Sequence, residues 1–159
     1  MKRALIPGSY DPVTLGHLAL IERAAELYDE VYAVVFINPD KEYSFSLDER
    51  VDMLRLATEH LQGVLVGCSS GLVIDYMREH SIDKIIKGYR NRTDYDYELV
   101  QAEWNKEHGG YETVLWECEP EMKEISSTLA RERIATGEKL SEILPEKVIE
   151  YVKNLDKNA

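Results

Sequence analysis

Short apolar runs of strand length alternate along this chain with longer segments of helical periodicity, and no other feature constrains the fold as much. The clearest run covers residues 31–37, which are all apolar or aromatic. Such a run is typical of a strand that is covered on both faces, as strands are in parallel sheets. Further strands are predicted at residues 2–6, 64–66, 83–86 and 113–116, and helical patterns separate them.

This order of strands and helices predicts an α/β fold with a five-stranded, mostly parallel sheet. Parallel neighbours need right-handed crossover connections, which place helices on both faces and give a Rossmann-like architecture. At 159 residues the chain can bury one substantial core but not two, so a single domain over residues 1–159 is expected. Within the helical segment 94–107, Tyr97, Val100 and Trp104 are predicted to face the core.

Composition and charge restrict the cellular compartment and the kinds of partner that are expected for this chain. The formal net charge is −11, which argues against nucleic-acid binding because phosphate backbones need a basic surface. No apolar run approaches the length of a membrane span and the N-terminus does not resemble a signal peptide, so a cytoplasmic protein with no membrane partner is expected. Cys68 and Cys118 lack a C-x-x-C spacing and are predicted to be buried free thiols.

Residues 5–17 combine a strand end, a loop and a helix start. The loop is rich in Pro and Gly, and the helix begins near Thr14. Free N–H groups and the positive end of the helix dipole favour phosphate at such a helix start. Thr14 and His17 add a hydroxyl and an imidazole on the same turn, and Gly16 lets a ligand approach the backbone closely. An ordinary N-cap at Thr14 and a partly buried surface histidine would explain the same residues.

Other polar residues follow the predicted strands at their carboxyl ends, which is the ligand side of an open α/β sheet. Lys41 follows the second strand, and Lys87 and Arg90 flank Gly88 after the fourth, where they could close on phosphate oxygens. The Ser-Ser-Thr sequence at 126–128 opens a later helix and adds a second N-terminus. Solvated surface charges and plain helix capping are the alternative interpretations. The shared edge of the sheet favours a polyanion site.

These groups predict direct transfer between bound substrates rather than a covalent enzyme intermediate. The sequence has no recognisable triad motif, no H-E-x-x-H motif and no Walker lysine loop. Nucleotidylyl transfer needs an acceptor phosphate aligned with the α-phosphorus of a nucleoside triphosphate, and donors aimed at the developing charge. His17 is predicted to donate to the α-phosphate and Thr14 to fix the turn. Mg²⁺ is expected to accompany the nucleotide on its phosphate oxygens, with no metal site in the protein.

Several motifs resemble those of the nucleotidylyltransferases that carry a T-x-G-H signature. Gly8-Ser9-Tyr10-Asp11-Pro12 with Thr14-Leu15-Gly16-His17 matches that signature. Within the superfamily the chain resembles the phosphopantetheine adenylyltransferases along nearly its whole length. The other matching segments are residues 38–41, 45–50, 86–90, 96–98 and 125–128.

The resemblance implies a reaction and an assembly. Similar proteins transfer AMP from ATP to 4′-phosphopantetheine, which gives dephospho-coenzyme A and pyrophosphate. They form homohexamers, and dephospho-coenzyme A or coenzyme A would bind as product or inhibitor.

The resemblance also implies site residues. The catalytic group would be His17 as transition-state stabiliser with Thr14, Lys41 and Arg90. The acceptor would contact Ser9, Lys41, Val73 and Lys87. ATP would contact Ser9, Tyr10, His17, Gly88, Tyr89, Arg90, Glu98, Met122, Lys123, Glu124, Ile125, Ser126, Ser127 and Thr128.

The chain departs from the pattern of that family at a few positions. Lys87 stands where arginine is usual, Ser9 replaces a common threonine, and residues 122–124 replace an aromatic-rich stretch. Lysine keeps the charge but loses the planar fork that binds phosphate bidentately, which predicts weaker binding of the acceptor phosphate. The alternative enzyme is a sister nucleotidylyltransferase that uses another phosphorylated acceptor or CTP. The alternative from another class is a nucleotide-binding regulatory subunit without turnover.

Overall fold

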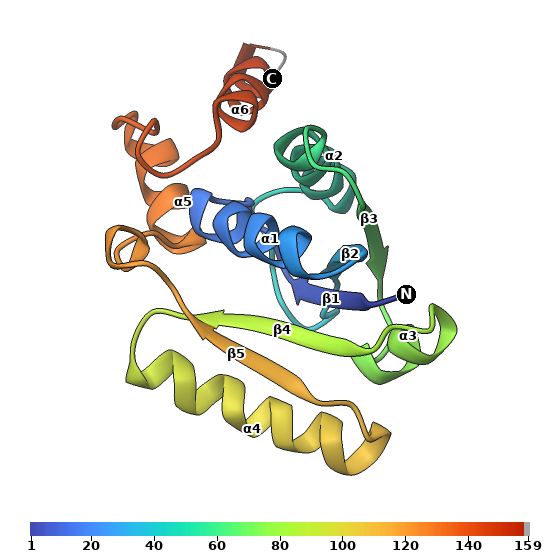
Figure 1. The fold of residues 1–159 in the computed structure, drawn as a ribbon. Coiled ribbons are helices and arrows are strands. Elements are labelled where there is room, and N and C mark those ends of the chain that lie inside the picture. The colour runs from blue at the N-terminus through green and yellow to red at the C-terminus, as the bar shows by residue number, and fades with distance from the viewer. Residues whose placement is uncertain (158–159) are drawn as a thin grey trace.

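The computed structural model describes residues 1–157 and has a five-stranded sheet with helices on both faces (Figure 1). The strand order is β3-β2-β1-β4-β5 and all neighbouring strands are parallel, so the predicted α/β architecture is confirmed. The elements are β1 (Arg3–Gly8), α1 (Leu15–Leu27), β2 (Glu30–Phe36), α2 (Leu47–Thr58), β3 (Val64–Ser69), α3 (Val73–Glu79), β4 (Lys84–Tyr89), α4 (Arg92–Gly109), β5 (Thr113–Glu117), the short 3-10 helix η1 (Pro120–Met122), α5 (Ser127–Thr136) and α6 (Glu146–Lys157).

The sheet is buried on both faces, as its apolar strands require. In β1, Ala4 and Ile6 belong to one core and Leu5 to the other, because successive side chains of a strand point to opposite faces. The first core includes residues of α1, α2, α5 and α6, and the second includes Met77 of α3. Figure 1 shows α1 and α4 on opposite sides of the sheet. The carboxyl ends of the strands therefore lie between two helix layers.

Reciprocal hydrogen bonds fix the starts of α1 and α2. The hydroxyl of Thr14 accepts from the backbone N–H of His17, and the His17 ring accepts from the backbone N–H of Thr14. The Ser-x-x-Glu spacing of residues 46–49 predicts a capping box, and Ser46 and Glu49 form it at the start of α2. β1 ends at Gly8 and α1 begins at Leu15, so the start of the helix lies just beyond the carboxyl end of the strand.

Several strands continue beyond their predicted ends. β1 continues to Gly8 and β5 to Glu117, and the largest extensions are those of β3 and β4. β3 continues to Ser69, and β4 continues to Tyr89, so Lys87 and Gly88 lie within the strand and not after it. Pairing with the neighbouring parallel strands extends both elements. The local apolar pattern does not report such pairing, since strand formation depends on contacts with distant segments. Lys87 is therefore anchored on a central part of the sheet.

α4 faces the sheet with a different side from the predicted one. Three residues expected in the core are largely exposed: Tyr97 (64%), Val100 (67%) and Trp104 (42%). The less exposed residues of α4 instead include Ala102 and Gly109. A Cβ at Gly109 would lie 2.7 Å from Cγ2 of Ile74 in α3. Close packing on α3 therefore selects the glycine side of α4, which the apolar periodicity could not show.

Two further predictions concern the cysteines and membranes. Both Cys68 and Cys118 are free thiols, as predicted. Neither is buried as predicted, since Cys118 is only partly buried and Cys68 is exposed on the edge strand β3. No helix within residues 1–157 has both the length and the apolarity needed to cross a membrane.

Gly63 has a backbone conformation and a close contact that exclude other residues. Its φ is +77°, and a Cβ there would lie 2.6 Å from the carbonyl oxygen of Asp29. Gly110 has a φ of +75°, but nothing lies within 4 Å of its Cβ position. We expect Gly63→Ala to lower the free energy of unfolding by about 2–4 kcal/mol and Gly110→Ala by about 1–2 kcal/mol. Urea unfolding of the two variants tests this, and equal losses would mean that the Asp29 contact is easily relieved.

Candidate active site

Two cavities meet at the carboxyl ends of β1 and β4. The larger cavity has a volume of about 550 Å³ and the smaller one of about 390 Å³. Five residues line both cavities and form what is called their common wall here: Pro7, Gly8, Ser9, Lys87 and Glu98. Ligands that filled the two cavities would therefore lie next to each other at these residues.

The larger cavity lies between the start of α1, the end of β4 and the start of α5. Most of the residues assigned to ATP by resemblance line it: Ser9, Tyr10, His17, Gly88, Tyr89, Arg90, Glu98, Met122, Ile125, Ser126 and Ser127, together with Thr14. Lys123, Glu124 and Thr128 do not line it. Lys123 instead pairs with Glu117 at 3.0 Å, and Thr128 accepts a hydrogen bond from Arg131.

His17 is held in one orientation by the first turn of α1. The backbone N–H of Thr14 donates to Nδ1 at 3.0 Å. Because Nδ1 accepts this hydrogen bond, the neutral ring carries its proton on Nε2. Tyr10 packs on the ring with 4.9 Å between ring centroids. The imidazole lines the larger cavity and offers it one fixed donor, Nε2–H.

The surroundings of His17 keep it neutral. Burial, together with the positive charges of Lys87 and Arg90, lowers the pKa of His17 from 6.5 to about 4. The ring is therefore uncharged near neutral pH. It can donate a hydrogen bond to a phosphate oxygen without acting as a cation.

The same pKa shift predicts how stability depends on pH. The unfolded chain binds a proton at His17 with a pKa near 6.5 and the folded chain does so only near 4. Between these values the unfolded chain binds more protons, so the free energy of unfolding falls as the pH is lowered. We expect His17 to account for up to about 2 kcal/mol of the fall between pH 7 and pH 5. Urea unfolding at both pH values, with His17→Gln as the reference, isolates this contribution, and an identical fall in the variant would contradict it.

Tyr10 and Ser9 occupy different positions relative to a ligand. Tyr10 is 1% exposed and its hydroxyl donates to the carbonyl of Ile6 at 2.7 Å. It therefore supports His17 and does not offer its hydroxyl to a ligand. Ser9 lies on the common wall of both cavities, and its carbonyl is held by Arg50 at 3.0 Å.

The start of α5 forms another side of the larger cavity. The hydroxyl of Ser126 accepts from the backbone N–H of Leu129, and the hydroxyl of Ser127 donates to the carbonyl of Pro12 at 2.8 Å. Both hydroxyls thus have structural partners. What the helix offers a ligand is the backbone N–H groups of its first turn and the positive end of its dipole.

Arg90 brings a positive charge to the same cavity. Its Nε donates to Asp94 of α4 at 2.9 Å, and its Nη1 donates to the carbonyl of Ile125 at 3.5 Å. These contacts link the end of β4 to the segment before α5. Arg90 is therefore fixed in place before any ligand binds.

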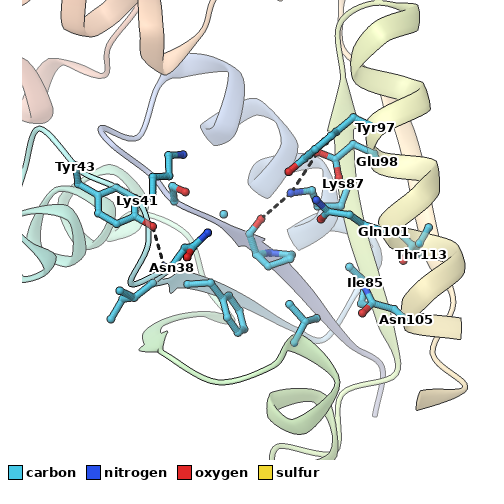
Figure 2. Close-up of a pocket in the computed structure, with 17 residues that line it drawn as sticks. Asn38, Lys41, Tyr43, Ile85, Lys87, Tyr97, Glu98, Gln101, Asn105 and Thr113 are labelled. Carbon is cyan, nitrogen blue, oxygen red and sulfur yellow. Dashed lines mark hydrogen bonds and ion pairs between the residues drawn. The ribbon is translucent and has the colours of Figure 1, made fainter. Parts of the chain in front are cut away.

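All four residues assigned to the acceptor by resemblance line the smaller cavity: Ser9, Lys41, Val73 and Lys87. Figure 2 shows Lys41 and Lys87 on opposite sides of this cavity. Lys41 comes from the loop after β2, together with Asn38 and Tyr43, whereas Lys87 comes from β4. Two ammonium groups can thus approach one ligand from two directions.

The sequence analysis missed the polar groups that α4 and β5 bring to the smaller cavity. Gln101 and Asn105 of α4 line it, and so does Thr113, whose hydroxyl oxygen is buried without a hydrogen-bond partner. The four-residue spacing of Gln101 and Asn105 places them on one side of a helix. That spacing could have indicated them, but the predicted inner side of α4 pointed elsewhere.

Buried polar residues fix the loop after β2 against the loop before α1. Asp11 is 5% exposed, and its carboxylate accepts from the backbone N–H groups of Ser44 and Phe45, both at 2.9 Å. Arg50 is 2% exposed and donates to the carbonyls of Ser9 and Phe45. The two walls of the smaller cavity are therefore tied together, and nothing in the local sequence of either loop indicated this.

Comparison with known proteins agrees with this arrangement. Residues 5–133 match the model of a family described as cytidylyltransferase-like. The chain belongs to this cytidylyltransferase-like family. A solved structure from Vibrio parahaemolyticus, described as a nicotinate-nucleotide adenylyltransferase, matches with a TM-score of 0.72 at 18% sequence identity, over 97% of this chain and 93% of that one. At this identity the similarity shows a shared fold.

Membership of the cytidylyltransferase-like family places the protein in the nucleotidyltransferase superfamily. The matched range contains the T-x-G-H turn at 14–17, the lysines of the smaller cavity and the start of α5. It ends before α6, which packs on α2 away from both cavities. The part of the chain that defines the family is therefore the part that builds the site.

Proposed function

We propose that the protein transfers AMP from ATP to 4′-phosphopantetheine, which gives dephospho-coenzyme A and pyrophosphate. The observation that carries the proposal is the common wall of the two cavities at Ser9 and Lys87. Direct transfer requires two substrates side by side with their reacting phosphates in contact, because the gain comes from holding them in line. We assign ATP to the larger cavity and the acceptor to the smaller one.

The larger cavity suits a nucleoside triphosphate. Two helix starts, those of α1 and α5, direct backbone N–H groups and dipoles toward it. Arg90 adds a fixed positive charge, and His17 adds a neutral donor. These groups would hold a chain of three phosphates between the two helices, in a protein whose net charge is −11.

The chemistry follows from this placement. An oxygen of the acceptor phosphate, held by Lys41 and Lys87, attacks the α-phosphorus of ATP in line and forms a new P–O bond. The bond from the α-phosphorus to the bridging oxygen breaks, and pyrophosphate leaves with the electron pair. His17 Nε2–H donates to a non-bridging oxygen of the α-phosphate, whose charge is stabilised most strongly in the transition state. No general base is required, because a phosphate monoester is mostly a dianion at neutral pH.

The side chains that line the smaller cavity favour an acceptor with an amide-containing arm. Beyond the lysines, its wall combines apolar groups such as Val73 and Ile85 with the side chains of Gln101, Asn105 and Thr113. Carboxamides both donate and accept hydrogen bonds, as the amides of a pantetheine arm do. A phosphate-only site would not need this extension.

The described residues do not supply a metal cage of their own. Within residues 1–157, no group of three His, Cys, Asp or Glu side chains could hold a metal ion. Asp94 is engaged by Arg90, and Glu98 is engaged by Lys87. We therefore propose that Mg²⁺ enters with ATP on its phosphate oxygens, where it would neutralise charge on the leaving pyrophosphate.

A pyrophosphate-release assay tests the proposed function. The purified protein is incubated with ATP or CTP and with 4′-phosphopantetheine, nicotinate mononucleotide or glycerol 3-phosphate, and the product is identified by mass. We expect release of pyrophosphate with ATP and 4′-phosphopantetheine, together with dephospho-coenzyme A. Reactions without an acceptor measure background hydrolysis.

The other outcomes of this assay each have a meaning. Product with another acceptor or with CTP would reject the proposed substrates and keep nucleotidylyl transfer. Binding of ATP without any product across the panel would favour a regulatory subunit.

A further inference from the structure

Glu98 is a carboxylate with only one partner, between the two cavities. Its side chain is 13% exposed and its Oε1 lies 3.5 Å from Nζ of Lys87. Its Oε2 is buried and has no hydrogen-bond partner. Buried polar atoms without a partner are uncommon because losing water costs free energy that nothing repays. Because Glu98 lines both cavities, a ligand can supply the missing partner.

The Lys87 ammonium already has partners before a ligand binds. Its Nζ donates to the carbonyl of Pro7 at 3.3 Å and forms the ion pair with Glu98 (Figure 2). A phosphate that binds Lys87 must therefore share the ammonium with the Glu98 carboxylate. Two anions on one partly buried cation repel each other, and screening by water is weak there.

Protonation of Glu98 removes this conflict. A carboxylic acid carries no charge to oppose the phosphate, and its O–H is a donor where the carboxylate had none. We infer that Glu98 takes up one proton from solvent when the acceptor phosphate binds, and that its Oε2–H then donates a hydrogen bond to that phosphate. No other bond changes. The inference rests on the proposed function, because it requires an acceptor phosphate at Lys87.

The electrostatic surroundings of Glu98 point the same way. Burial raises its pKa and Asp94 on the same helix raises it further, whereas Lys87 of β4 opposes the shift. The incoming phosphate would add another negative charge near Glu98 and weaken the hold of Lys87. Of the other ionisable groups that line the two cavities, the cations are Arg23, Lys41 and Arg90, and His17 is neutral. The acidic ones are Glu22, Glu26, Asp94, Glu117 and Glu119, and the remaining ones are Tyr10, Tyr43, Tyr89, Tyr97 and Cys118.

Calorimetry can count the protons. Binding of 4′-phosphopantetheine is titrated at one pH in several buffers with different heats of ionisation, for the wild type, Glu98→Gln and Glu103→Gln. Glu103 is an exposed glutamate on α4 that lines neither cavity. We expect the wild type and Glu103→Gln to take up more protons than Glu98→Gln, by up to about one per site. Protonation of the ligand itself contributes equally to all three and cancels.

The affinity gives a second readout. If a proton is taken up on binding, the Kd for 4′-phosphopantetheine rises with pH by up to about tenfold per unit more in the wild type than in Glu98→Gln. Equal proton counts and parallel pH profiles would overturn the inference, because a purely structural Glu98 changes the Kd equally at every pH.

Two further measurements keep the inference testable if a variant misfolds or the proposed acceptor is wrong. An infrared difference spectrum of the wild type should gain a carboxylic-acid carbonyl band on binding, and its absence would contradict proton uptake. If 4′-phosphopantetheine does not bind at all, the proposed function fails. The same calorimetric series with inorganic phosphate then decides whether Glu98 is protonated by a phosphate at Lys87.

Discussion

Replacement of His17 by alanine should lower kcat for pyrophosphate release by about 10²–10³-fold, which is the usual effect of losing one donor to a developing oxyanion. The Kd for ATP should change little, because Nε2–H donates to an oxygen that gains most of its charge in the transition state. Steady-state kinetics for kcat and equilibrium binding of ATP separate the two effects.

His17→Gln is the matched control for this change. The His17 ring also accepts the backbone N–H of Thr14 and so caps α1. Glutamine at the third helical position can accept that same N–H, so it keeps the cap and removes the imidazole. We expect both variants to lose turnover to a similar extent, with His17→Gln closer to wild-type stability. Wild-type turnover in His17→Gln would show that the cap matters and the imidazole does not.

Unchanged turnover in His17→Ala would have a different meaning. If the wild type releases pyrophosphate only at the background rate, an unchanged rate in the variant would favour the regulatory-subunit alternative. If the wild-type rate exceeds background, it would show that the imidazole does not stabilise the transition state. Weaker binding of ATP with an unchanged kcat at saturating ATP would instead place His17 in ground-state binding.

The elements that were predicted correctly depend on residues close together in the chain. The apolar runs predicted five strands in a parallel sheet, and the Ser46 and Glu49 pair predicted the start of α2. Capping and strand burial depend on residues within a few positions of each other, so a sequence displays them directly. The sequence also predicted the edge of the sheet at which the candidate site residues lie, because the carboxyl ends of parallel strands share one edge.

Long-range contacts explain what the sequence did not predict. The Ser127 hydroxyl, assigned to the triphosphate by resemblance, donates to Pro12, which lies 115 residues away. Asp11 reaches a loop 33 residues further on, and Arg50 returns 41 residues to Ser9. Each of these contacts arises only when separate loops meet at the edge of the sheet. In the sequence alone, these polar side chains cannot be distinguished from solvent-exposed ones.

The inner side of α4 was mispredicted for a related reason. Apolar periodicity through Tyr97 and Trp104 suggested one side, but the close approach of Gly109 to Ile74 selects another. In this orientation of α4, Glu98, Gln101 and Asn105 line the cavities. A helix next to a ligand site carries polar residues on its inner side, and a criterion based on burial of apolar residues then fails.

Lys87→Gln should lower kcat/KM for 4′-phosphopantetheine by about 10²-fold, because it removes a partly buried positive charge from the acceptor phosphate. Lys84→Gln is the matched control. Lys84 lies on the same strand and pairs with a glutamate at 2.6 Å, but it lines neither cavity. We expect Lys84→Gln to leave kcat/KM near the wild-type value. Lys87→Arg should retain or improve acceptor binding, since it restores the planar fork.

Loss of the ammonium has a second consequence that a double variant can separate. In Lys87→Gln the Glu98 carboxylate loses its ion pair, so the acceptor phosphate binds either against its charge or together with a proton taken up by Glu98, and both cost free energy. The variant Lys87→Gln with Glu98→Gln removes that cost. Its kcat/KM for 4′-phosphopantetheine should therefore exceed that of Lys87→Gln alone, and the difference should grow as the pH is raised. If the double variant is no better than the single one at any pH, Glu98 imposes no such cost and the lysine acts only through its own charge.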